Sequence, residues 1–416
     1  MRQTVRLALS ASIVCCLLPA PMWGAVQQVS RGAVADTTYG CLICHAEKRR
    51  TFSLGIHSEY GIRCHDCHGG DATSYEREQA HRGRFIGTPG KLATIELCSS
   101  CHADANMMRQ YGLPAGQLAE FRTSRHGELL LERRDLNAPT CTDCHDAHTI
   151  LPPEDARSNV YPTNIPATCA RCHDDAQLMQ RYGIPTDQFA EYRSSAHGVA
   201  VFEKSNFAAP TCMGCHGSHA ALPPGVTEVV NVCDHCHVLI GRAFLQGPHN
   251  EPSQNGVLAG CLGCHSNHGT ERVPTDAIAS VCANCHDPGS RAGLLGVDLQ
   301  ESLVEAAADL ASAERAIASL TVGGKQVSDE RFRYQTALTQ YRQMGLALHS
   351  LDLDFLDELA RSVRSNTELV RTTAEVRAER RWEHKLLLVP VWFLALSAFV
   401  FAWFKLRDLA GRDDTS

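Results

Sequence analysis

A long apolar run lies near the C-terminus, where nineteen residues from Leu386 to Phe404 carry no charge. A run of this length suits one transmembrane helix. Trp382 and Trp403 stand near its two ends, where interfacial aromatic residues are typical. A buried core helix is the alternative. We predict a transmembrane helix over residues 386–404 and a tail over residues 405–416.

Residues 297–381 precede this run and show helical periodicity. The apolar residues of a first stretch recur at helical spacing; they are Leu303, Ala307, Leu310, Ala313, Ile317 and Leu320. Gly323 and Gly324 interrupt the pattern. A second stretch contains Phe332, Leu338, Tyr341, Leu348, Leu356, Leu359 and Val363. We interpret the region as a helical hairpin or small bundle that acts as a stalk, with a docking face for a partner as the alternative.

The N-terminus has the pattern of a signal peptide over residues 1–25. Arg2 and Arg6 precede an apolar stretch, and small residues follow Trp23. A membrane anchor is the alternative, but the stretch is short for a span. Residues 26–40 then read as a short linker.

Nine copies of Cys-x-x-Cys-His occupy residues 41–290, which lack the long apolar periodicity of the C-terminal part. They use eighteen of the twenty cysteines; the other two, Cys15 and Cys16, lie in the N-terminal apolar run. The motif is the attachment signature of c-type haem: two cysteines form thioethers and the histidine ligates iron. Zinc sites need two cysteine pairs per metal and no fixed histidine, and disulfides need no histidine at all. Nine covalently attached haem c groups are the better prediction.

The predicted haem-binding residues follow directly from the nine motifs. The covalent attachment residues are Cys41, Cys44, Cys64, Cys67, Cys98, Cys101, Cys141, Cys144, Cys169, Cys172, Cys212, Cys215, Cys233, Cys236, Cys261, Cys264, Cys282 and Cys285. The proximal iron ligands are His45, His68, His102, His145, His173, His216, His237, His265 and His286. About 28 residues per haem are too few for a conventional apolar core. The fold class expected is mainly α with extensive loops around a haem core.

An internal repeat points to the second iron ligands. Residues 98–153 and 169–224 match after a shift of 71, and two histidines outside the motifs obey the same shift. A shortened copy follows at residues 233–268, and a degenerate copy begins at Cys41. A low-spin haem needs a distal ligand, usually His or Met. The candidates are His57, His81, His126, His148, His197, His219, His249 and His268.

Eight distal candidates leave one of nine irons without a partner. His65 and His235 lie inside motifs, and Met108 and Met179 match across the repeat, so each is an alternative ligand. Packing is the commoner role of such methionines. A five-coordinate haem open to a small molecule is the remaining alternative. His349 and His384 fall in the helical part and are expected at the surface.

Charge argues against one class of partner. The formal net charge is −7, and the propionates of nine haems would add eighteen carboxylates. So acidic a surface excludes nucleic acid as an expected partner.

The alternation of Cys-x-x-Cys-His with His-Gly and Cys-x-x-Cys-His-x-x-His resembles the doubled-motif multihaem cytochromes c. These include periplasmic pentahaem and decahaem carriers of anaerobic respiration. The resemblance covers residues 41–286 and implies bis-histidine haems stacked in a conducting chain. The C-terminal extension looks more like membrane-tethered cytochromes, and it is also similar to multihaem nitrite and hydroxylamine enzymes. The chain has no Cys-x-x-Cys-Lys, so the nitrite reductase form is not supported.

We therefore expect a nonahaem cytochrome c domain over residues 41–290 on the periplasmic side, anchored to the cytoplasmic membrane by a single pass with a cytoplasmic tail. The expected activity is electron transport rather than catalysis. The expected partners are a membrane quinol-oxidising or other redox complex, and a periplasmic redox protein or terminal reductase. The alternatives are an oxidoreductase with one open haem acting on a small nitrogen or sulfur compound, and a fixed subunit of a respiratory complex.

Overall fold

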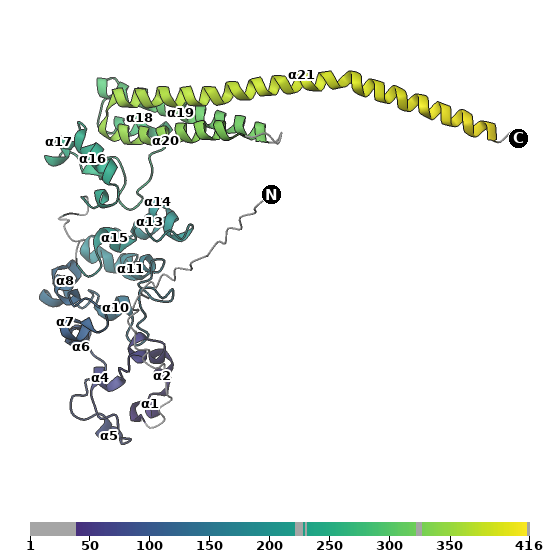
Figure 1. Ribbon diagram of the computed structural model, residues 1–416. Helices are drawn as coiled ribbons and strands as arrows, with labels where there is room; N and C mark the ends of the chain where they lie inside the picture. The colour runs from purple at the N-terminus through teal and green to yellow at the C-terminus, as the bar shows by residue number, and fades with distance from the viewer. Residues whose placement is uncertain (1–38, 221–227, 229–230, 322–326, 414–416) are drawn as a thin grey trace, which may run out of the picture. The chain divides into compact units, whose positions relative to one another are not determined.

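The computed structural model describes residues 39–220, 228, 231–321 and 327–413 (Figure 1). The predicted signal peptide, nearly all of the linker and the end of the tail lie outside the described residues. Within these ranges the chain forms helices, turns and irregular segments without a strand. This is the mainly α, loop-rich class that the sequence predicts.

Residues 39–290 form short helices separated by long loops. In chain order the α-helices are α1 (Gly40–Cys44), α2 (Ala46–Ser53), α3 (Ile56–Glu59), α4 (Cys64–His68), α5 (Arg77–Ala80), α6 (Lys91–His102), α7 (Ala105–Arg109), α8 (Gln117–Thr123), α9 (Arg125–Gly127), α10 (Cys141–His145), α11 (Ile165–His173), α12 (Ala176–Met179), α13 (Gln188–Ser194), α14 (Ala196–Phe202), α15 (Cys212–His216), α16 (Val238–Gln246), α17 (Asn250–Gln254) and α18 (Ile278–Ala283). One π-helical turn, η1 (Glu128–Glu132), and the 3₁₀ turns η2 (Gln180–Tyr182), η4 (Cys233–His235), η5 (Gly260–Gly263) and η6 (Thr275–Ala277) lie between them.

The chain divides into two compact units. One contains the residues up to Cys98 together with Pro139–Asn159, and the other contains Ser99–Ala138 together with the residues from Val160 onward. In the first unit, hydrogen bonds join segments far apart in the sequence. The Ile56 amide donates to the Ile150 carbonyl at 2.8 Å, and Thr149 Oγ1 donates to the Thr51 carbonyl at 3.2 Å. Such polar links hold loops in place where apolar side chains are few.

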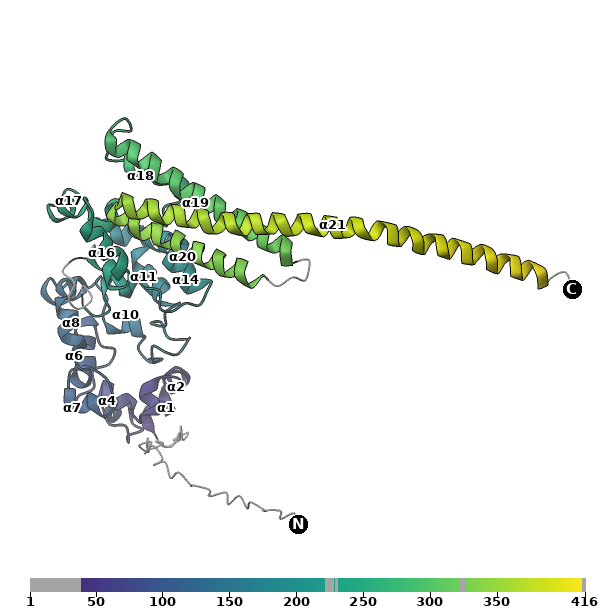
Figure 2. The same ribbon diagram turned by 45° about the horizontal axis from the view of Figure 1, so that its top comes forward.

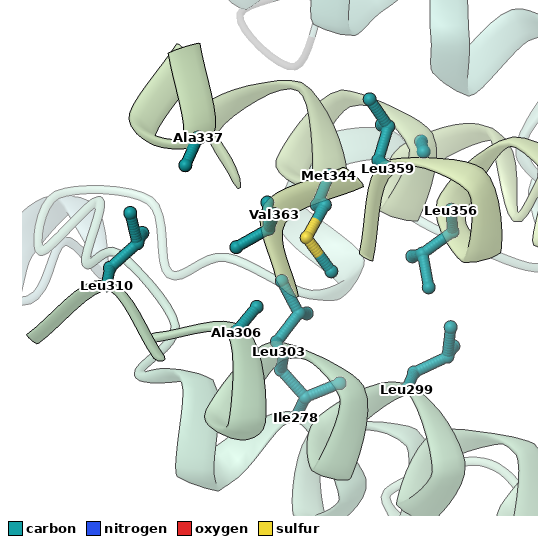
Figure 3. Close-up of a cluster of buried hydrophobic side chains, with 11 residues drawn as sticks. Ile278, Leu299, Leu303, Ala306, Leu310, Ala337, Met344, Leu356, Leu359 and Val363 are labelled. Atoms are coloured by element: carbon teal, nitrogen blue, oxygen red, sulfur yellow. The ribbon is translucent and has the colours of Figure 1, made fainter. Parts of the chain in front are cut away.

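The second unit ends in three long helices, α19 (Arg291–Thr321), α20 (Ser328–Ser350) and α21 (Leu353–Asp413). Both views show α19 and α20 beside the first part of α21 (Figures 1 and 2). The buried residues of α19 alternate in steps of three and four, which is the spacing of a coiled-coil seam; they are Leu299, Leu303, Ala306, Leu310, Ala313, Ile317 and Leu320. Leu299, Leu303, Ala306 and Leu310 meet Met344 of α20 and Val363 of α21 in one apolar cluster (Figure 3). Ala313, Ile317 and Leu320 form a second cluster with Val370 of α21.

The bundle differs from the sequence prediction in three details. The second helical stretch is two helices, because Leu351 adopts a left-handed conformation (φ 52°) and Asp352 Oδ1 accepts a hydrogen bond from the Phe355 amide. Ala306 is buried in place of the predicted Ala307. Phe332 is 74% exposed and lies outside the core.

An ion pair with one buried partner joins two helices of the bundle. Glu330 of α20 is only 3% exposed, and its Oε1 lies 2.9 Å from Arg377 Nη2 of α21. A buried charge is costly unless it is paired. The pair therefore favours the alignment of α20 and α21 that brings these two residues together.

Helix α21 runs without interruption from the bundle into the apolar C-terminal run. Residues Leu388–Arg407 have a mean hydropathy of 1.8 and are exposed along the whole segment. Twenty helical residues extend roughly 30 Å, which matches the hydrocarbon core of a bilayer. By length and composition this segment is a candidate membrane span, and it overlaps the predicted span of residues 386–404.

The bundle core provides a stability prediction. Met344→Ala removes a side chain that is 0% exposed, and it should lower the free energy of unfolding of the bundle by about 2–5 kcal/mol. Hydrogen exchange of peptides from α19–α21, followed by mass spectrometry, measures this loss. Phe332→Ala, at a 74% exposed site of the same helix, should change it by no more than about 0.5 kcal/mol. Equal effects of the two variants would contradict the assigned core.

Candidate haem-ligating histidine pairs

The Cys-x-x-Cys-His motifs occupy short helical turns. Three of them form complete five-residue helices, α4, α10 and α15. Asp66 and Asp143 stabilise the first two of these helices, because each accepts a hydrogen bond from the backbone amide three residues earlier, at 2.7 and 2.8 Å. One helical turn places residues i, i+3 and i+4 on the same side. The two cysteines and the histidine of each such motif therefore face one ligand together.

The first cysteines of successive motifs lie next to each other. Cys98 and Cys141 hydrogen-bond through their side chains, which raises the pKa of Cys98 and lowers that of Cys141 to about 7. Cys169 and Cys212 form an equivalent pair, as do Cys233 and Cys261. These sulfur atoms are the predicted thioether positions. Their proximity would bring the edges of two attached porphyrins together.

In the second unit, cysteines of successive motifs lie near each other as far as the motif at Cys282. Burial raises the pKa of Cys215, and the neighbouring charge of Cys236 adds to the effect. Burial and then the neighbouring Cys282 raise the pKa of Cys264 in the same way. The motifs that begin at Cys169, Cys212, Cys233, Cys261 and Cys282 are thus neighbours in sequence order.

Seven motif histidines each face a second histidine from outside the motifs. The ring centroids of all seven pairs are 6.0–6.3 Å apart. The pairs, with the motif histidine first, are His45 and His81, His68 and His148, His173 and His126, His237 and His197, His216 and His268, His286 and His249, and His265 and His349.

This spacing fits an iron ion between two imidazoles. Metal–nitrogen bonds of about 2 Å on opposite sides of one ion place the two ring centroids roughly 6 Å apart. Direct stacking of two rings would allow much closer approach. The motif residues and the facing histidines therefore suit haem with two axial imidazole ligands.

Burial keeps many of these imidazoles in the form that binds metal. Desolvation lowers the pKa of seven histidines and so favours their neutral state; they are His102, His126, His148, His173, His197, His216 and His349. A ligating histidine must be neutral, with a free lone pair toward the metal.

Hydrogen bonds to backbone carbonyls orient several rings. His68 Nδ1 lies 2.8 Å from the Gly87 carbonyl, and His265 Nδ1 lies 3.1 Å from the Glu271 carbonyl. When Nδ1–H donates to a carbonyl, Nε2 carries the free lone pair. Such outer partners are typical of metal-ligating histidines because they fix both the tautomer and the ring direction.

The repeated sequence Ser-x-His-Gly has a structural cause. Ser124 Oγ accepts a hydrogen bond from the Gly127 amide at 2.9 Å, and Ser195 Oγ accepts one from the Gly198 amide at 2.9 Å. Each serine caps the helical turn that carries His126 or His197. A Cβ atom at Gly127 or Gly198 would clash with the carbonyl oxygen of Phe121 or Tyr192. Glycine thus allows the turn to pack closely enough to present its histidine.

The described pairs follow a regular order along the repeats. The lone histidine of one repeat faces the first motif of the next repeat, as His126, His197 and His249 do. The histidine that trails the second motif faces back to the second motif of an earlier repeat, as His148 and His268 do. Each repeat therefore completes sites in its neighbours.

Six of the eight candidate distal histidines take part in these pairs: His81, His126, His148, His197, His249 and His268. All of the ligand roles stay predictions, including those of His57 and His219 and of the motif histidines His102 and His145. His219 Nδ1 lies 3.7 Å from Glu120 Oε2.

His349 is the site residue that the sequence reasoning missed. The prediction of a surface position is incorrect, because this residue is partly buried and faces His265. The side chain of His384 lies outside the described residues. The only sequence signal for His349 was the shortfall of one ligand.

The other alternative ligands have different surroundings. Met108 and Met179 are 4% and 5% exposed, and each lies in a short helix capped by an aspartate, Asp104 or Asp175. His65 Nδ1 lies 2.7 Å from the Tyr39 hydroxyl, and His235 is exposed. These environments are those of packing and surface residues.

Comparison with known proteins identifies part of the chain. Residues 56–174 match the family model described as Cytochrome c3. No curated protein and no solved structure matches the chain significantly. The matched region contains the motifs that begin at Cys64, Cys98, Cys141 and Cys169, together with His126 and His148.

The tight turns at the Ser-x-His-Gly sequences provide a prediction for the site. Gly127→Ala and Gly198→Ala should each displace one histidine and convert one low-spin haem into a form that binds carbon monoxide after reduction. Electron paramagnetic resonance and a carbon monoxide titration measure this change. Gly116→Ala is the control, because its added Cβ would meet nothing closer than 3.5 Å. Unchanged spectra of both variants would show that these turns do not position ligands.

Proposed function

Since this chain is a multihaem cytochrome c, we propose that it is a nine-haem electron conduit tethered to the cytoplasmic membrane by α21, with its haem-binding region in the periplasm. Haem, when bound, supplies reversible one-electron chemistry at its iron. The observation that carries the proposal is the set of seven motif histidines that each face a second imidazole at 6.0–6.3 Å.

The paired histidines favour electron transfer over catalysis. Two axial imidazoles leave no coordination position for a substrate. An open haem is an alternative only because eight distal candidates are available for nine motifs. With His349 included, nine histidines outside the motifs are assigned or predicted as ligands. This number equals that of the motifs.

The succession of cysteines supports a conducting chain. Within the second unit, the side chain of Cys169 contacts that of Cys212, and the side chain of Cys233 contacts that of Cys261. Each of these residues is the first cysteine of its motif. Attached groups at such positions would lie edge to edge. Electrons would then pass between neighbouring sites in the order of the sequence.

The bundle lies beside the last attachment site. A Cβ atom at Gly296 of α19 would come within 2.9 Å of Cys282 Sγ, and Cys282 packs against the apolar cluster of the bundle. Helix α21 leaves the same bundle toward its apolar segment. We propose that electrons from a membrane quinol-oxidising or other redox complex enter at the haem attached at Cys282 and Cys285. They then leave to a periplasmic redox protein or terminal reductase in anaerobic respiration.

Removing the last attachment site tests where electrons enter. Cys282→Ala combined with Cys285→Ala should abolish reduction of the remaining haems by quinol in membranes that contain the donor complex. Reduction by dithionite should be unchanged, because it does not need that site. Stopped-flow absorbance of the haem bands measures both rates.

The matched control removes the first attachment site instead. Cys41→Ala combined with Cys44→Ala should leave quinol-linked reduction of the remaining haems intact. A haem count establishes that each variant lost one haem. Normal quinol-linked reduction of the Cys282 and Cys285 variant would refute the assigned direction, and fewer than nine haems in the unaltered protein would refute the proposed number.

The anchor and its orientation can be tested by truncation. A chain that ends after Arg380 keeps the Glu330–Arg377 pair and should appear in the soluble periplasmic fraction. A chain that ends after Gly411 keeps the apolar segment and should remain in the membrane. In spheroplasts, external protease should degrade the haem-binding region and spare a tag at the C-terminus. Retention of the shorter chain in the membrane, or loss of the tag, would contradict the proposal.

A further inference from the structure

A histidine of the helical bundle faces one of the motif histidines. His349 lies in the last turn of α20, and its ring centroid is 6.2 Å from that of His265. The two ring planes differ by 13°. The distance lies within the 6.0–6.3 Å range of the six other pairs, although the bundle contains no Cys-x-x-Cys-His motif.

Both rings of this pair are oriented in the same manner. His349 Nδ1 lies 2.5 Å from the Gly345 carbonyl one turn earlier in α20, and His265 Nδ1 lies 3.1 Å from the Glu271 carbonyl. Donation by Nδ1–H to a carbonyl leaves Nε2 of each ring as the free ligand atom. Two separate hydrogen bonds thus prepare the two rings for one metal between them.

The packing around His349 fixes its backbone. Ala347, two residues before His349, is 1% exposed, and Leu351 ends α20 in a left-handed conformation. Gly247 approaches the end of α20 so closely that an added Cβ would lie 2.9 Å from the His349 carbonyl oxygen. Helix α16 therefore packs directly on the turn that carries this histidine.

The order of the repeats explains why the bundle must supply this residue. The second motif of a repeat faces the trailing histidine of a later repeat, as His68 faces His148 and His216 faces His268. The repeat that begins at Cys282 contains one motif and no trailing histidine. His265 would therefore lack a partner if the chain used its repeats alone.

We propose that His349 is the distal axial ligand of the haem attached at Cys261 and Cys264, opposite His265. This inference rests on the proposed binding of haem at every motif. The bundle is then part of an iron site as well as a spacer, and the same bundle continues through α21 into the apolar segment. The coordination bond ties the membrane-proximal helices to the conducting chain.

Removal of the imidazole tests the assignment. In purified full-length protein, His349→Ala should produce one haem in nine that is high-spin and binds carbon monoxide after reduction. His349→Met should keep this haem low-spin and raise its reduction potential, because thioether ligation favours the reduced iron. Gln343→Ala, which removes an exposed side chain of α20 outside every motif, should give the spectra of the unaltered protein.

The haem content distinguishes a failure of the role of His349 from a failure of the proposed nine-haem conduit. Nine haems in every variant, with no new carbon monoxide site in His349→Ala and no shifted potential in His349→Met, would overturn the role of His349 and leave the conduit intact. A haem content below nine in the unaltered protein would instead count against the proposed function. If the alanine variant fails to fold, the potential of the methionine variant decides the question.

Discussion

The structure of the haem-binding region depends on opposed imidazoles held about 6 Å apart. In this part of the chain the helices are short and few apolar residues are buried, so the chain cannot be held by a conventional core. Each paired site joins residues that are far apart in the sequence, such as His68 and His148. An iron bound between two such rings would act as a cross-link. Serine caps, and glycines where two backbone segments approach closely, hold the rings in this geometry.

The bundle is stabilised by a different kind of interaction. Its helices bury apolar residues in steps of three and four, and the ion pair between the buried Glu330 and the partly exposed Arg377 joins α20 to α21. The two kinds of organisation meet in the second unit. Gly296 packs on Cys282, Gly247 packs on the end of α20, and His349 faces His265. The region that the sequence suggested as a stalk is therefore joined to two adjacent motifs.

The repeat explains both the regularity of the sites and their exceptions. Because the lone histidine of one repeat completes a site of the next, and the trailing histidine completes a site of an earlier one, the two ends of the array lack a neighbour. At the start, His45 faces His81. At the end, His265 faces His349. The two histidine pairs that depart from the repeat pattern thus lie at its two ends. There, residues from outside the pattern supply the second imidazole.

The sequence alone determined the features that depend on local spacing. The nine motifs, the 71-residue shift that relates His126 to His197, the helical class and the apolar C-terminal run all follow from residues near one another in the chain. Only the tertiary structure decided which histidines face each other, since a pair such as His265 and His349 joins a loop to a helix 84 residues away. It also decided that α20 and α21 are separate helices and that Ala306 rather than Ala307 is buried. Periodicity predicts a helix face, but the tertiary packing selects which residues of that face are buried and which histidines face each other.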